Sequence, residues 1–291
     1  MYAIETRGLT KYYGKVRGIE KVDLQVEEGD FFGFIGPNGA GKSTTIRTLL
    51  GLISPTGGTA RVLGRDILKE KIALLEEVGY LPAEASLYGS MRAGELIALS
   101  ASLRKKDCKK EAADLCERLQ LDPARRIGEL SLGNRKKVGI VCALQHRPRL
   151  YVLDEPTSGL DPLMQQEFYA LLQERCREGA TVFLSSHALS EVAKHCRRAA
   201  VIRDGRVLVS DRVDKLGQTG VKRVILRGVT RPPALEGMRN LITENDTVSF
   251  LYNGSPSQLL AALAPLPLTD FTVSDPDLEE VFMHFYEKGA Q

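Results

Sequence analysis

Gly36-Pro37-Asn38-Gly39-Ala40-Gly41-Lys42-Ser43-Thr44 matches in full the G-x-x-x-x-G-K-[ST] pattern of a phosphate-binding loop. Its glycines let consecutive backbone N–H groups point at phosphate oxygens, while Lys42 can reach the β- and γ-phosphates and Ser43 can ligate Mg²⁺. A buried-strand run at 31–35 precedes the loop, and residues 44–50 can form a helix whose positive end faces the phosphates. A chance glycine-rich turn would not bring all these features together. The sequence therefore predicts a nucleoside triphosphate site.

The segments around this loop alternate between strand and helix patterns. A strand at 150–153, a helix at 164–177 and a strand at 181–185 follow one another, an order that indicates a parallel sheet covered by helices. Three further predictions complete this part of the chain: short strands at 3–6 and 22–26, a helical segment at about 85–147, and a hairpin at Asp204-Gly205. We expect an α/β fold with a parallel core, an antiparallel β part and a helical part.

The sequence changes in character after residue 216. Strand patterns at 221–228 and 247–252 are followed by Ser255-Pro256-Ser257-Gln258, a helix start with a candidate capping box, and Asp275-Pro276 begins a last amphipathic helix. Nothing in this part has catalytic spacing. We therefore expect a nucleotide-binding domain at 1–216 and a small α+β accessory domain at 217–291.

Composition and charge are those of an ordinary globular protein. The 291 residues are 43% hydrophobic and 26% charged, and a net charge of +3 is too small to predict a nucleic-acid partner. Five scattered cysteines without a Cys-x-x-Cys pair suit a reducing cytosol and argue against disulfides or a zinc site. The N-terminus shows no secretory signal, and the longest apolar run, 259–268, contains two prolines and is too short to span a bilayer. We expect a cytoplasmic chain whose membrane role, if any, needs another polypeptide.

Three polar side chains follow predicted strands of the parallel sheet. Asp154 and Glu155 end the strand at 150–153, and His187 ends the next one. Buried strands rarely end in paired acids without a cation or a proton to manage. Next to a phosphate-binding loop, Asp154 would hold Mg²⁺, Glu155 would orient and deprotonate water, and His187 would contact the γ-phosphate. The plainer interpretation is an exposed acidic strand end and a polar cap.

A second phosphate site is a further possibility at Leu130-Ser131-Leu132-Gly133-Asn134. Ser131 is a good N-cap for the basic helix that follows, and Gly133 permits close backbone approach. The simpler interpretation is a capped helix start alone. In the same way, Thr157-Ser158-Gly159-Leu160-Asp161-Pro162 could be no more than a turn that leads into a helix.

Taken together, residues 2–215 resemble the ATP-binding cassette (ABC) family, with the motifs in the family's order and spacing. The resemblance implies that Ser131, Gly133 and Asn134 contact the γ-phosphate of ATP held by an opposite subunit. It implies that the segment ending at Asp161 links the two sites, and that His187 is the switch histidine. It also implies that Tyr13, or less plainly its neighbour Tyr12, stacks on adenine.

The chain departs from the family pattern at two places. Leu132 stands where the signature usually has Gly, and Asn134 stands where it has Gln, a change that keeps an amide on a shorter arm. After the run 79–82, Ala83 stands where the family places a Gln that helps to ligate Mg²⁺. The adjacent Glu84 is a candidate replacement ligand for the metal.

Within the family, the chain looks most like the cassettes of ABC-2 type exporters that serve drug or antibiotic-peptide resistance. This implies an ATPase subunit that uses ATP and Mg²⁺ and forms a homodimer or pairs with another cassette subunit. It would work on the cytoplasmic face with separately encoded transmembrane permease subunits. The alternatives are a non-transport ABC ATPase acting on nucleic acid or ribosomes, and a regulatory module that binds ATP with little turnover. A phosphate-loop kinase is remote, since the signature and the switch histidine would then be unexplained.

Overall fold

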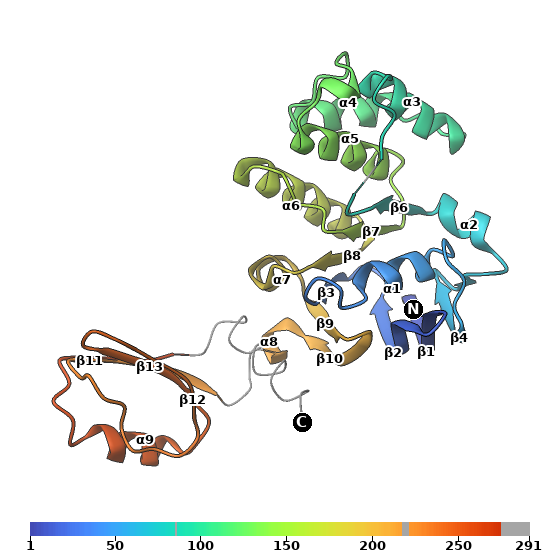
Figure 1. The fold of residues 1–291 in the computed structure, drawn as a ribbon. Helices are drawn as coiled ribbons and strands as arrows, with labels where there is room; N and C mark the ends of the chain where they lie inside the picture. Colours follow the sequence, from blue (N-terminus) through green and yellow to red (C-terminus); the bar gives the residue numbers. More distant parts are fainter. Residues whose placement is uncertain (85, 217–220, 275–291) are drawn as a thin grey trace. The chain divides into compact units, whose positions relative to one another are not determined.

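The computed structural model describes residues 1–84, 86–216 and 221–274, and it divides the chain into two compact units, Met1–Asp211 and Arg212–Gln291 (Figure 1). The sequence places the corresponding boundary after residue 216. The assignment of nucleotide binding to the first unit and of an accessory role to the second stays a prediction.

A six-stranded sheet forms the centre of the first unit. Its strand order is β10-β9-β3-β8-β7-β6, and the pairs β9–β3, β3–β8, β8–β7 and β7–β6 are parallel. Strands β3, β7 and β8 are buried throughout, which explains their continuous apolar sequences. The predicted parallel α/β core is confirmed. The strands are β3 Phe31–Ile35, β6 Val78–Leu81, β7 Leu150–Asp154, β8 Thr181–Ser186, β9 Arg198–Arg203 and β10 Arg206–Arg212.

A smaller antiparallel sheet, in the order β2-β1-β4-β5, lies beside the helix that follows the phosphate-binding loop (Figure 1). The two short strands predicted at its start are much longer in the structure, and β1 and β2 form a hairpin that closes at the pair Tyr13 and Val16. The sequence did not indicate the longer strands, because the residues near the turn are polar and show no alternating apolar pattern. The strands are β1 Tyr2–Tyr13, β2 Val16–Glu27, β4 Gly57–Val62 and β5 Arg65–Asp66.

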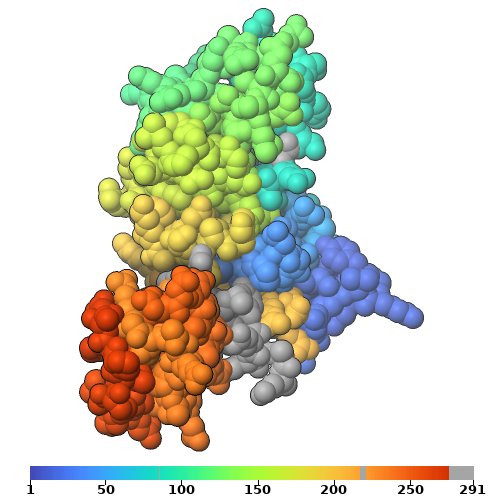
Figure 2. All heavy atoms as spheres, turned by 60° about the vertical axis from the view of Figure 1, so that its left-hand side comes forward, coloured from blue at the N-terminus to red at the C-terminus, as the bar shows by residue number. Residues whose placement is uncertain are grey.

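Helices α3, α4 and α5 gather at one end of this unit, within the segment predicted to be helical (Figure 1). Figure 2 shows the surface of this group adjoining that of α6, where Arg118 of α4 binds Glu167 and Glu174 of α6. Helix α5 approaches β6 closely, because a Cβ on Gly79 would lie 2.2 Å from the Ala143 oxygen. The helices of the unit are α1 Lys42–Leu49, α2 Lys71–Glu76, α3 Ala93–Leu103, α4 Lys109–Arg118, α5 Leu132–Leu144, α6 Pro162–Arg177 and α7 Leu189–His195, with a 3₁₀ turn at Ile127–Glu129.

The second unit contains a four-stranded antiparallel sheet, in the order β12-β13-β11-β14, with its own apolar core. The sequence predicted β11 and β13 but not β12 or β14. Ser255 stands at the start of α9 as expected, yet its hydroxyl lies 2.7 Å from that of Ser257 and makes no capping bond. The elements are α8 Val213–Leu216, β11 Lys222–Arg227, β12 Met238–Glu244, β13 Thr247–Tyr252, α9 Pro256–Leu263 and β14 Asp270–Ser274. The helix predicted from Asp275 lies outside the described residues.

The helices are short relative to a bilayer. Within the part of the chain that the structure describes, none is both long enough and apolar enough to cross a membrane.

Candidate nucleotide-binding site

A cavity of about 420 Å³ opens beside the phosphate-binding loop. Its volume is within the range of small-molecule sites in proteins. It joins four parts of the fold: the β1–β2 hairpin, the loop with the start of α1, the loop after β6, and the end of β7. The residues that line it are Tyr13, Val16, Arg17, Gly18, Pro37, Asn38, Gly39, Gly41, Lys42, Ser43, Thr44, Ala83 and Glu155.

The backbone of the loop depends on its glycines. Gly41 has a φ of 107°, and a Cβ there would lie 2.9 Å from the Gly18 oxygen, so a larger residue would be strained and crowded. Helix α1 begins directly after it with no side-chain cap and no acidic residue in its first turn. The N–H groups at the start of α1 therefore face the cavity with the helix dipole behind them, an arrangement that attracts anions.

Lys42 is buried at the base of this cavity. Its ammonium donates to the carbonyl oxygens of Gly36 at 2.6 Å and Pro37 at 3.2 Å. The same Nζ lies 3.2 Å from Glu155 Oε1. Lys42 thus binds the loop and a carboxylate at once, in the place where a phosphate would also be bound.

Asp154, Glu155 and His187 meet at the carboxyl edge of the sheet, as the sequence predicted. Asp154 is 1% exposed, and its Oδ1 accepts a hydrogen bond of 2.5 Å from Ser185 Oγ. Glu155 has a φ of 47°, an uncommon value that turns its side chain away from the strand direction. Its Oε2 lies 2.7 Å from His187 Nδ1. The two oxygens of Glu155 therefore bind different partners, Lys42 and His187.

Glu191 supports this edge and was missed in the sequence. Its carboxylate accepts hydrogen bonds from Thr157 at 2.8 Å and from Ser186 at 2.9 Å. These bonds join the turn after Glu155 to the end of β8, next to His187. An acidic residue in the first turn of a helix, close after a polar strand end, is the signal that could have identified it.

Lys136 was also missed, because the sequence showed it only as one of three consecutive basic residues in the helix that follows Ser131. It is 8% exposed, and its ammonium donates to the carbonyl oxygens of Ala83 at 2.9 Å and Pro82 at 3.4 Å. Burial lowers the pKa of Lys136, while the charges of Asp154, Glu155 and Glu84 oppose that shift. Lys136 therefore joins the loop that lines the cavity to α5, the helix that Ser131 caps.

The residues of the second predicted phosphate site lie together, but they do not line the cavity that contains Lys42. Ser131 caps α5 by accepting from the backbone N–H of Asn134 at 3.3 Å, and Asp161 caps α6 through Met164 at 3.0 Å. A Cβ on Gly133 would lie 2.4 Å from the Gly159 oxygen, so these two turns touch. Within one chain they form a separate surface.

Two more predicted residues lie at the rim or beyond it. Tyr13 is 47% exposed at the mouth of the cavity, with Lys11 Nζ at 5.2 Å from the centre of its ring. Ala83 lines the cavity, whereas Glu84 is exposed and is not among the lining residues. This geometry gives Glu84 no support as a metal ligand, and its role stays a prediction.

Comparison with known proteins agrees with this geometry. The sequence profile described as ABC transporter matches residues 19–158. Bacitracin transport ATP-binding protein BcrA of Bacillus licheniformis is 37% identical over 209 residues, which cover 70% of this chain and 68% of the relative. Daunorubicin/doxorubicin resistance ATP-binding protein DrrA of Streptomyces peucetius is 32% identical over 301 residues, covering 97% of this chain and 91% of the relative. A solved ATP-binding subunit of an ABC transporter, 29% identical, covers 74% of this chain and 91% of its own, with a TM-score of 0.70.

Proposed function

The chain belongs to the ABC transporter family, and we propose that it is the ATP-hydrolysing subunit of an exporter whose membrane subunits are separate polypeptides. As an ABC ATPase it binds and hydrolyses ATP. Two similar chains carry names that refer to bacitracin transport and to daunorubicin/doxorubicin resistance, and these names support export of a drug or antibiotic peptide.

In this proposal, the triphosphate of ATP occupies the cavity beside residues 36–44, and Tyr13 stacks on the adenine at its rim. The uncapped start of α1 supplies N–H donors for the phosphate oxygens. Lys42 then exchanges its bonds to the Gly36 and Pro37 carbonyls, and its contact with Glu155, for bonds to the β- and γ-phosphates. Lys42→Ala would lose this charge-assisted binding.

The acidic side chains at the edge fit Mg²⁺, because Asp154 is almost fully buried and Glu155 Oε1 has the ammonium of Lys42 as its neighbour, at 3.2 Å, which movement onto the phosphates would withdraw. The buried carboxylate of Asp154 carries a charge that a hard cation would balance. Ser43 and Asp154 would hold the ion. When bound, Mg²⁺ would neutralise phosphate charge in the transition state.

Glu155 is proposed to accept the proton of the attacking water. Lys42 occupies Glu155 Oε1 in the structure, so the movement of Lys42 onto the phosphates would leave this oxygen open to water. His187 binds the other oxygen at 2.7 Å and would keep the carboxylate oriented.

A second subunit would complete the site. Ser131, Gly133 and Asn134 form a surface apart from the cavity of their own chain, so they are proposed to contact the γ-phosphate held by the opposite subunit. Asp161 and the turn before it would connect the two sites. Closing of such a pair on ATP, and its opening after hydrolysis, would transmit motion to the membrane subunits.

The chain of contacts from Lys42 to Glu155 to His187 at the mouth of the loop supports this proposal most directly. We expect Glu155→Gln to bind ATP but to lose phosphate release, and Lys42→Ala to lose most ATP affinity. Lys110→Ala, a change at an exposed lysine, serves as the matched control. It should change neither the ATP affinity nor the rate of phosphate release. Steady phosphate release by Glu155→Gln at the wild-type rate would contradict the role of Glu155.

The transport part of the proposal needs a different experiment. The tagged chain should copurify from detergent-treated membranes with a polypeptide that has several bilayer-spanning segments. Its phosphate release should rise in the presence of that polypeptide. If DNA or ribosomes stimulated the ATPase instead, export would be the wrong function.

A further inference from the structure

Glu191, in the first turn of α7, binds two segments of the chain at the carboxyl edge of the central sheet. Its Oε1 accepts a hydrogen bond of 2.8 Å from Thr157 Oγ1, and its Oε2 accepts one of 2.9 Å from Ser186 Oγ. Thr157 lies in the turn after Glu155, and Ser186 ends β8. One carboxylate thus joins the two segments, and no step of the proposed hydrolysis uses it.

The Ser186 end of this link determines where His187 lies. Ser186 Oγ donates to Glu191 and accepts from the backbone N–H of Ala188 at 3.0 Å. The residues before and after His187 are therefore held by one hydroxyl. The His187 side chain is 60% exposed, so little packing holds it in place. Its contact with Glu155 depends on the position of this backbone.

The Thr157 end leads to the surface that is proposed to meet a second subunit. The carbonyl oxygen of Thr157 accepts from the backbone N–H of Leu160 at 3.0 Å, and the turn ends at Asp161, the N-cap of α6. In the same turn, the Gly159 oxygen lies where a Cβ on Gly133 would be only 2.4 Å away. Because the two backbones pack this closely, a displacement at Gly133 would displace the turn as well.

The hydroxyls of this link are shielded from water. Thr157 is 6% exposed and Ser186 is 1% exposed. Hydrogen bonds to a carboxylate are stronger than those between neutral groups, and a buried polar group that loses its partner costs free energy. A small displacement of Thr157 is therefore expected to shift Glu191 and Ser186 with it rather than to break the two bonds.

We propose that Glu191 is a positioning residue that couples the turn 157–161 to His187, and through His187 to Glu155. Contact of that turn with a second subunit would then set the rate of hydrolysis in the same chain. The inference rests on the proposed function, because it needs hydrolysis and a second subunit. Glu191 contacts neither ATP nor the attacking water, so its loss should lower kcat and leave ATP binding and subunit pairing intact.

The first test measures phosphate release by Glu191→Ala. Its kcat should fall about tenfold, the effect typical of one lost hydrogen bond, while KM for ATP stays within about twofold. Glu191→Gln should retain at least about a third of the wild-type kcat, because its amide can reach both hydroxyls and a hydroxyl can also accept. If Glu191 only anchored α7, its loss would lower stability in urea without lowering kcat.

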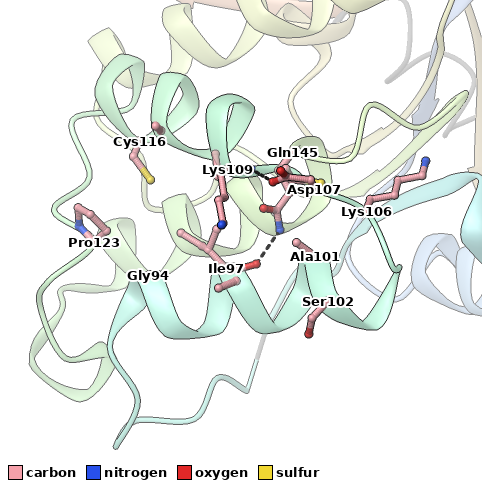
Figure 3. Close-up of a pocket in the computed structure, with 14 residues that line it drawn as sticks. Gly94, Ile97, Ala101, Ser102, Lys106, Asp107, Lys109, Cys116, Pro123 and Gln145 are labelled. Atoms are coloured by element: carbon pink, nitrogen blue, oxygen red, sulfur yellow. Dashed lines mark hydrogen bonds between the residues drawn. The ribbon is translucent and has the colours of Figure 1, made fainter.

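Lys194→Ala is the matched control, an exposed position on the same helix that should alter neither kcat nor KM. Thr157, Ser186 and Glu191 do not line the hollow of about 500 Å³ between α3 and α4 (Figure 3). The substitutions therefore act at the edge of the sheet and not on that part of the surface.

A double-variant comparison tests the link without changing Glu191. Thr157→Val and Ser186→Ala each remove one hydroxyl and should each lower kcat. If both hydroxyls act through Glu191, the double variant should fall little below the slower single variant, whereas independent effects would multiply. This comparison decides the matter if Glu191→Ala does not fold.

A wild-type kcat for Glu191→Ala, or effects of Thr157→Val and Ser186→Ala that multiply, would overturn the inference. Sedimentation with ATP and Mg²⁺ gives a third outcome. If Glu155→Gln pairs but the double variant Glu155→Gln, Glu191→Ala does not, Glu191 belongs to the pairing surface and the inference is wrong. Failure of the proposed function is distinguishable, because Glu155→Gln would then release phosphate at the wild-type rate or would not pair at all.

Discussion

Lowering the pH from 7.5 to 5.0 should destabilise this protein through one buried histidine. His146 follows α5, is 4% exposed, and its Nε2 lies 3.2 Å from the Val78 carbonyl. A carbonyl can only accept, so Nε2 carries the hydrogen and Nδ1 is the basic atom. Nδ1 has no partner among the described residues. A proton added to it would leave a charged donor buried and unpaired.

Burial, with help from the charge of Arg104, lowers the pKa of His146 from 6.5 to about 4. Between these two values the unfolded chain binds a proton that the folded chain does not, so stability rises with pH in this window. The stability that the neutral His146 provides is fully present above pH 6.5 and is lost as the pH falls toward 4. At pH 5 the loss is about 2 kcal/mol of unfolding free energy.

Urea unfolding of the wild type and of His146→Gln at pH 7.5 and 5.0 measures this loss. Glutamine can still donate to the Val78 carbonyl but does not titrate in this range. The wild type should therefore lose about 2 kcal/mol more than the variant between the two pH values. His195, whose pKa is also lowered by burial, is present in both proteins and cancels in the difference. Equal losses, or a pKa of His146 near 6.5 in an NMR titration, would refute this reasoning.

Two substitutions test other contacts in the first unit. Lys136→Met removes the bonds to Ala83 and Pro82, so kcat for phosphate release should fall about tenfold with ATP affinity nearly unchanged, and the exposed Lys110→Met should alter neither. An unchanged kcat would show that Lys136 does not position the loop. Gly79→Ala would place a Cβ 2.2 Å from the Ala143 oxygen and should cost about 1–3 kcal/mol in urea unfolding, whereas Gly57→Ala, 3.7 Å from Thr10, should cost far less. Similar costs for both would contradict the close contact between α5 and β6.

The parallel core and its edge were predictable because their signals are local. A continuous apolar strand that ends in polar residues indicates both burial and position, so Asp154, Glu155 and His187 could be assigned to one edge before any coordinates were known. The glycine spacing at 36–44 was informative for the same reason.

Elements without a buried face could not be predicted in this way. Six of the seven residues of β12, and all five of β14, are exposed, so neither strand shows the alternation that marks a half-buried strand. Lys136 stood in a basic run that is usually solvated, and only the three-dimensional approach of α5 to the loop after β6 reveals that its ammonium is buried. The partner of a buried charge depends on tertiary contacts rather than on spacing in the chain.

The central claim is that the ATP site at the loop of one chain is completed by a second chain, which contributes Ser131, Gly133 and Asn134. Sedimentation of Glu155→Gln with and without ATP and Mg²⁺ tests it, together with the double variant Glu155→Gln, Ser131→Asp. Aspartate preserves the N-cap of α5 but places a negative charge against the γ-phosphate. We predict dimers of Glu155→Gln only with ATP, and monomers of the double variant that still bind ATP. ATP-bound monomers of Glu155→Gln, or unimpaired dimers of the double variant, would contradict the claim.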